Sequence, residues 1–62
     1  MNPDIVKIIL RCREYGIDRV RFADHHGMRF LLSDDNGIVF RDDTVSYEDF
    51  RKLEIEINNL LV

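Results

Sequence analysis

This sequence contains one cysteine, no long apolar run and no glycine-rich loop. Because Cys12 has no partner in the chain, an intrachain disulfide is excluded and a reducing compartment is favoured over secretion. Apolar runs such as Ile8–Leu10 are far too short for a membrane span, and the opening residues lack the basic stretch of a signal peptide. We therefore expect a cytoplasmic chain. The missing glycine-rich loop also excludes the common phosphate-binding motifs.

What the sequence does contain is the composition of a folded domain. Of its 62 residues, 45% are apolar and 34% are charged, whereas disordered chains carry fewer apolar side chains at such charge. We expect one compact domain over residues 1–62. A domain of this size buries only about 60% of the surface that its unfolded chain exposes, so its stability is marginal.

The first element is predicted as a helix over residues 3–15. Asn2 can cap it, and Pro3 suits the first helical position because no backbone N–H is needed there. Gly16 ends the helix, since glycine readily adopts the left-handed conformation, and Ile17 then folds back onto the last turn in a Schellman motif. The apolar stripe of this helix consists of Ile5, Ile8, Ile9, Cys12 and Tyr15.

Three strands are predicted from the alternation of apolar and polar residues, over 18–23, 28–33 and 38–41. The pair Asn36-Gly37, between the second and third strands, suits the positive φ of a hairpin turn. With strict alternation, the side chains that face the core are Val20, Phe22, Met28, Phe30, Leu32, Ile38 and Phe40.

A second helix is predicted over residues 46–61. Ser46 is its N-cap with Asp49 at the third helical position, and Val45 can pack on Phe50. Its apolar stripe consists of Phe50, Leu53, Ile57, Leu60 and Leu61. The expected fold class is therefore α+β, a small αβββα domain in which both helices cover one face of a three-stranded antiparallel meander.

The segment Asp24-His25-His26 offers three side chains of the kinds that bind metal ions. It falls between two predicted strands, where Gly27 supplies the backbone freedom of a tight turn. Adjacent residues on a turn point apart, whereas a catalytic metal site needs ligands held rigidly around one centre. We therefore predict a hairpin tip and no functional metal. The pair His25 and His26 would bind nickel or zinc only incidentally.

No other residues form a catalytic set. Cys12 lies on the core-facing stripe of the first helix, where a thiol behaves as a small apolar group. The pairs Asp34-Asp35 and Asp42-Asp43 lie in turns, where solvated aspartates are common. We expect a protein that is not an enzyme and that carries no cofactor.

Charge is distributed unevenly along the chain. Residues 1–33 carry six basic and four acidic side chains, whereas residues 34–62 carry three basic and eight acidic side chains. By strand parity, the predicted outward face of the sheet carries Arg19, Arg21, Arg29, Leu31, Val39 and Arg41. Arginine is enriched at interfaces because its planar guanidinium pairs with carboxylates or phosphates and its stem covers apolar area. We predict a binding surface here, with a merely solvated sheet face as the alternative.

A second predicted surface lies on the helices. At 100° per residue, Val6 and Leu10 on the first helix and Ile55 and Val62 on the last fall outside the core stripes. Because the core of so short a chain is small, these residues favour a symmetric homodimer through the helices. The alternative is a wide core that absorbs all four.

Two classes of function remain. The preferred one is a small protein-binding module or inhibitor, of the kind encoded by phages, prophages or bacterial operons. It would act on an unidentified partner protein through the arginine face or the acidic C-terminal half. The alternative is nucleic-acid binding, with the sheet arginines on phosphates. A net charge of −3 and the lack of aromatic residues on the predicted outward face disfavour this alternative.

Overall fold

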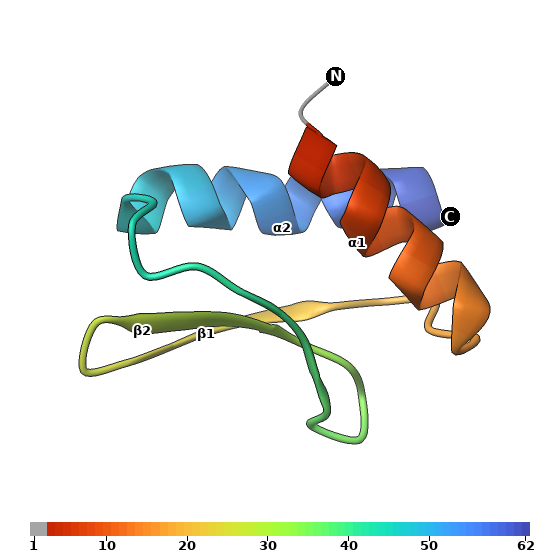
Figure 1. Cartoon of the computed structure of the whole chain (residues 1–62), viewed down its shortest axis with the longest axis horizontal. Helices are drawn as coiled ribbons and strands as arrows, with labels where there is room; N and C mark the ends of the chain where they lie inside the picture. The colour runs from red at the N-terminus through yellow and green to blue at the C-terminus, as the bar shows by residue number, and fades with distance from the viewer. Residues whose placement is uncertain (1–2) are drawn as a thin grey trace.

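Two helices lie on one side of a three-stranded antiparallel sheet in the computed structural model, which describes residues 3–62 (Figure 1). In chain order the elements are α1 (Pro3–Glu14), β1 (Arg21–His25), β2 (Met28–Leu32), β3 (Ile38–Arg41) and α2 (Tyr47–Leu61). The strands are neighbours in the order β1-β2-β3, which makes the sheet a meander. The predicted αβββα fold class is confirmed. The strand β1 begins and ends later than the predicted 18–23.

The helix α1 ends as its sequence predicts. The N–H of Ile17 donates to the carbonyl of Cys12 at 2.8 Å, and the N–H of Gly16 donates to the carbonyl of Arg13 at 3.4 Å. These are the two hydrogen bonds of a Schellman motif, and Gly16 has the required positive φ of 67°. Ile17 packs against the core, so the motif also turns the chain towards β1. The predicted cap at Asn2 lies outside the described residues.

The helix α2 begins at the predicted N-cap. The side-chain oxygen of Ser46 accepts a hydrogen bond from the N–H of Asp49 at 3.2 Å, which satisfies one of the free donors in the first turn. Val45, just before the cap, packs against the core. The cap therefore fixes where α2 starts, and the apolar stripe of the helix then decides which of its sides meets the sheet.

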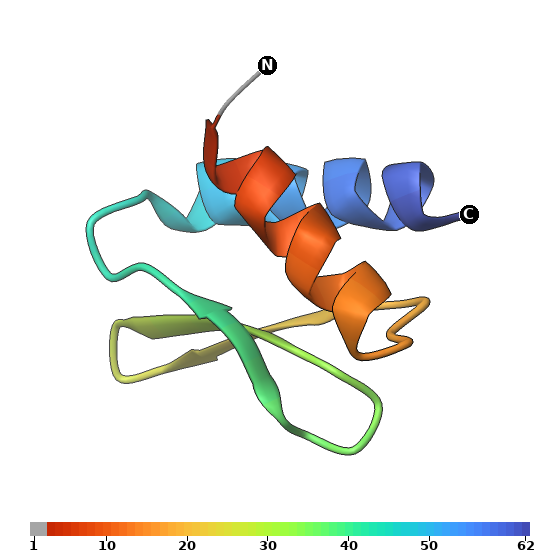
Figure 2. The ribbon, with the colours of Figure 1, turned by 45° about the vertical axis from the view of Figure 1, so that its right-hand side comes forward.

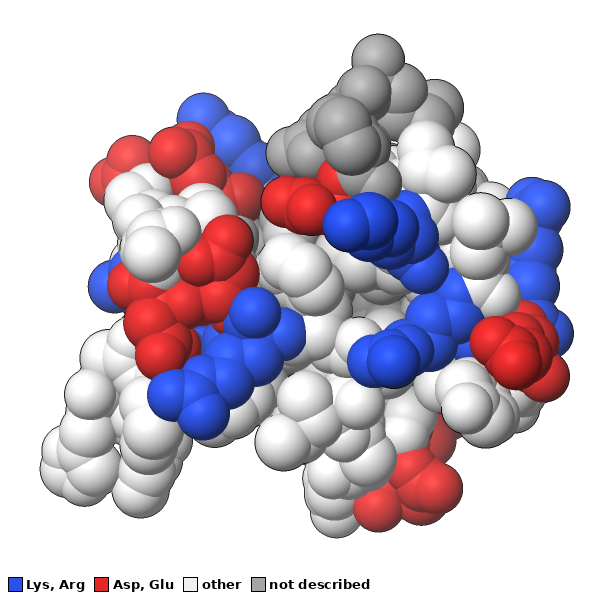
Figure 3. Space-filling view, in the orientation of Figure 1, with Lys and Arg blue, Asp and Glu red and all other residues white. Residues whose placement is uncertain are grey.

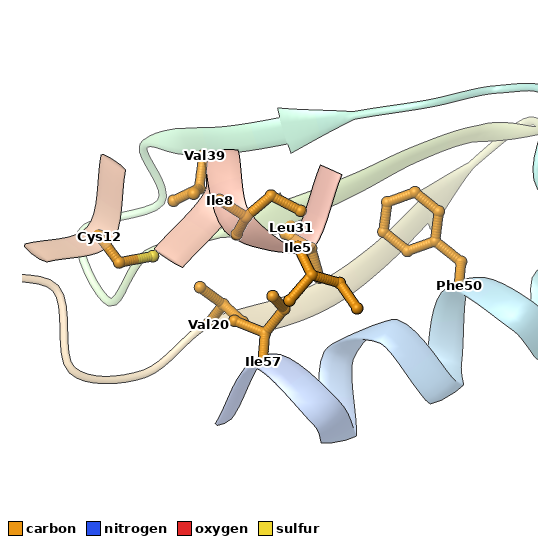
Figure 4. Close-up of a cluster of buried hydrophobic side chains, with 8 residues drawn as sticks. All are labelled: Ile5, Ile8, Cys12, Val20, Leu31, Val39, Phe50 and Ile57. Atoms are coloured by element: carbon orange, nitrogen blue, oxygen red, sulfur yellow. The ribbon is translucent and has the colours of Figure 1, made fainter. Parts of the chain in front are cut away.

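The core lies between the helices and the sheet. The helix α1 packs against α2 and β3, whereas α2 also packs against β1 and β2 (Figures 1 and 2). The buried apolar side chains come from both helices, from β2 and β3 and from the residue before β1 (Figure 4): Ile5, Ile8, Cys12, Val20, Leu31, Val39, Phe50 and Ile57. Burial raises the pKa of the Cys12 thiol, which is a packing group as predicted. Tyr15 was also placed in the α1 stripe, but it is exposed.

The orientation predicted for β2 is wrong. Leu31 was placed on the outward face, but it is fully buried in the core. It pairs directly with Phe22 of β1, which faces the helices, and directly paired residues project to the same side of a sheet. The reason is that β2 has apolar residues on both of its faces, so alternation alone does not indicate which face is buried. Met28, Phe30 and Leu32 consequently project away from the helices.

The orientation predicted for β3 is wrong at two of its residues. Leu31 pairs with Phe40 while Leu32 pairs with Ile38, so Val39 is the extra residue of a β-bulge. Val39 is buried and Phe40 also packs against the core, whereas Ile38 is 59% exposed. Strict alternation would have placed Val39 outside and Ile38 inside. For β1, by contrast, the inward orientation of Phe22 is confirmed.

Candidate binding face of the sheet

The free edge of β1 is closed by side chains of α2. The Asn58 Oδ1 accepts the N–H of Val20 at 2.8 Å and its Nδ2 donates to the Val20 carbonyl at 3.0 Å. One helical turn earlier, Glu54 Oε2 accepts the N–H of Phe22 at 2.6 Å. Four residues of a helix rise about 6 Å, and two residues of a strand span about 6.7 Å. Glu54 and Asn58 are therefore spaced to reach the backbone groups of Phe22 and Val20, which point outward from the same edge of the strand. This part of the edge is not available for pairing with another strand.

The free edge of β3 is also protected. The guanidinium of Arg11 on α1 donates to the carbonyl of Val39 at 3.2 Å, and the bulge at the same residue bends the strand. Short, bulged edges with a charged side chain across them discourage strand addition. Both edges of the sheet thus meet side chains from a helix, and the sheet face that points away from the helices is the broad surface that remains.

We call this surface the outer face. It follows from the strand pairing and the inward orientation of Phe22, Leu31 and Phe40. Its residues are Arg21, Ala23 and His25 on β1, Met28, Phe30 and Leu32 on β2, and Ile38 and Arg41 on β3. No helix covers it within residues 3–62 (Figure 1). Figure 3 views the sheet from its side and shows acidic side chains at the bottom, near the β2–β3 turn.

Two arginines lie across the outer face from opposite edges. The guanidinium of Arg41 lies 5.6 Å from the centre of the Phe30 ring and also pairs with Asp43 at 2.8 Å. Arg21 reaches across from β1 to donate to the side chain of Asn36 in the β2–β3 turn. Their stems cover part of an apolar surface that would otherwise meet water. Ile38 remains largely exposed beside them.

The predicted arginine surface is therefore only partly assembled. Arg19, Arg21 and Arg41 are exposed, but the apolar centre assigned to Leu31 and Val39 is in the core. Phe30, Leu32, Met28 and Ile38 form the apolar centre instead. Most of this difference arises because the predicted alternation along β2 is offset by one residue. Such an offset moves each side chain of the strand to the other face of the sheet.

Arg29 lies on the inner face, contrary to the prediction. Its guanidinium donates to the carbonyl of Val45 and pairs with Asp24 at 3.1 Å, and its side chain is only 21% exposed. Its backbone N–H donates to Asp43 at 3.2 Å. Arg29 thus holds the β3–α2 connection against the sheet. A strand that is apolar on both faces and carries one arginine gives no sequence signal for this role.

The segment Asp24-His25-His26 forms a hairpin tip, as predicted. His26 and Gly27 both have positive φ, at 53° and 83°, which is the geometry of a two-residue type I′ turn. The Asp24 carboxylate accepts the N–H of Gly27 at 3.1 Å and pairs with Arg29. The rings of the two histidines pack edge to face, with 4.4 Å between their centroids. Across residues 3–62, His, Cys, Asp and Glu side chains do not gather in threes around a possible metal position.

The helix residues assigned to a dimer surface are all exposed. The exposed fractions are 44% for Val6, 60% for Leu10, 57% for Ile55 and 104% for Val62. A wide core that absorbs these side chains is therefore excluded. Self-association through them stays a prediction.

Neither helix of residues 3–62 is long and apolar enough to cross a membrane. Comparisons with protein-family models, with curated proteins and with solved structures gave no match to this chain. The candidate site is therefore defined by its geometry and chemistry alone.

Proposed function

We propose that this chain is a non-enzymatic protein-interaction module that docks through its outer face. The observation that carries the proposal is the contrast between sheet edges that helix side chains protect and an apolar sheet face that no helix covers. Phe30, Leu32 and Ile38 form the centre of this face. Apolar surface of this kind on a small protein is a common feature of interaction sites.

The partner surface would be apolar at its centre and acidic at its rim. Apolar side chains would pack on Phe30 and Leu32, while carboxylates would pair with Arg21 and Arg41. Aromatic residues and arginine are enriched among the residues that contribute most to binding at interfaces. Docking would displace Arg41 from the Phe30 ring or trap it there, and either arrangement removes apolar surface from water.

Nucleic-acid binding remains the second candidate, and one observation favours it. Phe30 lies on the outer face beside Arg41, although the sequence pattern placed no aromatic residue on the predicted outward face. A base could stack on such a ring while arginines contact phosphates. Against this stand the net charge of −3, the single aromatic residue on the face and the acidic β2–β3 turn nearby.

Substitutions on the outer face separate the candidates from a merely solvated surface. Ile38→Glu places a charge on the exposed apolar centre, and Arg21→Glu reverses the charge of its rim. If the outer face docks on a protein, both variants should lose a partner that the wild type retains, at unchanged circular dichroism. Ile55→Glu, on the exposed side of α2, is the matched control and should retain that partner. Equal retention by all three variants refutes the proposal.

For nucleic acid, the measurement is fluorescence anisotropy with random single-stranded oligonucleotides. Binding that weakens steeply with salt and is lost in Arg21→Glu and Arg41→Glu would replace the protein partner with nucleic acid. Absence of binding at low salt excludes this candidate.

A further inference from the structure

A hollow lies at one end of the sheet, where the β2–β3 turn comes beside the C-terminal end of α1 (Figure 2). Its volume of about 680 Å³ is within the range of ligand-binding pockets. One wall comes from the last turn of α1 and its Schellman motif, and the other comes from the β2–β3 turn and the start of β3. Only the folded chain brings these two segments together.

Part of this hollow is apolar and exposed. Tyr15, which the sequence pattern placed in the core, is 69% exposed, and Ile38 is 59% exposed. The half-buried side chain of Ile17 also lines the hollow. Single exposed apolar residues are common on protein surfaces, but Tyr15 and Ile38 line the same concave surface. A ligand seated there would remove both from water.

Carboxylates accompany the apolar side chains. Asp18, Asp34 and Asp35 line the hollow, and the C-terminal end of α1 adds the negative pole of the helix dipole. Hydrogen bonds from Ser33 and from the N–H of Gly37 lower the pKa of Asp35, so that this carboxylate stays ionised. The side chains of Asp18 and Asp34, by contrast, make no hydrogen bond or ion pair within residues 3–62. They are available to a cation from outside the chain.

The basic residue in the described lining is already engaged. The guanidinium of Arg11 donates to the carbonyl of Val39 at 3.2 Å, at the edge of β3. Three carboxylates and this one guanidinium leave the lining with a formal charge of −2. Concave surfaces of one sign of charge concentrate ligands of the opposite sign. The hollow therefore favours a cationic ligand.

The apolar walls indicate which kind of cation fits. A metal ion would make no use of Tyr15 and Ile38, and it needs several oxygen ligands around one centre. An arginine side chain uses the whole lining. Its guanidinium pairs with carboxylates and stacks on aromatic rings, while its stem covers apolar area.

The openness of the hollow to solvent indicates how that side chain arrives. Pockets for free small molecules bury most of the surface of their ligand, which this open hollow does not do. A side chain that projects from a larger partner needs no such enclosure, because the surrounding interface excludes water from it.

From this charge and shape we infer that the hollow binds an arginine side chain presented by a segment of a partner protein. The guanidinium pairs with Asp34 and Asp18, and the stem packs on Tyr15 and Ile38. This site goes beyond the proposed function, because its charge is opposite to that of the arginines on the outer face. Ile38 belongs to both surfaces, so a partner that covers the outer face reaches the hollow across this residue.

Titration followed by amide NMR spectra tests the site, with N-acetyl-arginine amide as the probe at low salt. Exposed ion pairs contribute little each, so we expect saturable binding with a dissociation constant of about 1 mM. The amides of Gly16, Gly37 and Ile38 should shift. N-acetyl-citrulline amide has the same shape without the charge and should cause no saturable shift. Absence of saturation by the arginine probe, or equal binding of the citrulline probe, overturns the inference.

Variants of exposed residues locate the binding. Asp34→Asn should weaken binding of the arginine probe about fivefold, as for loss of one exposed ion pair, and Tyr15→Ala should weaken it by a similar factor. Glu56→Gln, on the exposed side of α2, removes the same charge away from the hollow and is the matched control. It should bind like the wild type. If Glu56→Gln weakens binding as much as Asp34→Asn does, general charge attraction explains the result and the inference is wrong.

Two further probes test the chemistry of the occupant. N-acetyl-lysine amide should bind more weakly than the arginine probe, because an ammonium group lacks the planar fork that pairs with carboxylates and stacks on a ring. Equal binding overturns the choice of arginine. The free amino acid arginine should also bind no more tightly than the millimolar range. A micromolar affinity for it would identify a small-molecule site and overturn the partner segment.

This inference and the proposed function fail separately. Asp34 and Tyr15 lie outside the outer face, and the probe is an arginine derivative that carries no acidic group. If the probe does not bind but Arg21→Glu loses a partner that Ile55→Glu retains, only the arginine site is wrong. If the probe binds as expected and Arg21→Glu loses nothing, the hollow stands and the outer face is not the docking surface.

Discussion

The two faces of the sheet carry similar apolar side chains but meet different surroundings. On the inner face, Leu31 is fully buried in the core, and Phe22 and Phe40 contact the Phe50 ring at 5.4 and 6.1 Å between centroids. On the outer face, Phe30 meets the guanidinium of Arg41. Apolar composition therefore does not by itself indicate which face of a strand is structural. The inner face is part of the core because the helices cover it, whereas no helix of residues 3–62 covers the outer face.

The largest expected difference is between two adjacent leucines. Leu31→Ala removes a fully buried side chain and leaves a cavity, which typically costs about 2–5 kcal/mol, enough to unfold much of so small a domain. Leu32→Ala removes the same atoms from the outer face and should cost less than about 1 kcal/mol, within the range of surface substitutions. Urea unfolding followed by circular dichroism measures both. Equal losses would show that the outer face is part of the core.

The next effect concerns the closed edge of β1. Asn58→Ala removes both hydrogen bonds to Val20 and leaves a backbone N–H without its acceptor, which should cost about 1–3 kcal/mol. Asn59, its neighbour on α2, is exposed, and Asn59→Ala is the control, with little expected effect. Hydrogen exchange at the Val20 amide should quicken only in the first variant. Unchanged exchange there would mean that α2 does not protect this edge.

A smaller difference separates the two sheet arginines. Arg29→Ala should destabilise the fold by about 1–2 kcal/mol, because its covered guanidinium bridges Asp24 and the Val45 carbonyl. Arg41→Ala removes an exposed ion pair with Asp43, for which about 0–1 kcal/mol is typical. Thermal unfolding distinguishes them. A larger loss for Arg41 would place the structural arginine on the outer face.

The smallest expected effect is a loss of folding stability in acid, caused by protonation of the two aspartates that follow β3. Hydrogen bonds from Thr44 lower the pKa of Asp42, and the Arg41 side chain, followed by the Arg29 N–H, lowers the pKa of Asp43. A lowered pKa contributes stability that is complete above the ordinary value of 3.8 and is lost as pH falls through the lowered value. Urea midpoints should therefore decline below that pH, and Asp42→Asn should flatten the decline.

Local signals predicted the elements well because each rests on neighbouring residues. The Schellman motif at Gly16 and the cap at Ser46 satisfy backbone groups within one turn, and the hairpin tip at His26-Gly27 needs only two residues with positive φ. The candidate site was predicted less well. The arginines at 21 and 41 are on the expected face, but the apolar centre was assigned to residues that belong to the core.

The sequence by itself determined the order of the elements, their caps and turns, and the exposed positions of α1 and α2 such as Leu10 and Ile55. Only the tertiary structure decided which face of β2 is buried and that Val39 is an extra residue in β3. The physical reason is that a strand with apolar residues on both sides can be buried either way by its own pattern. Pairing of Leu31 with Phe22, beneath helices that are distant in the chain, selects one orientation and leaves Phe30, Leu32 and Ile38 on the outer face.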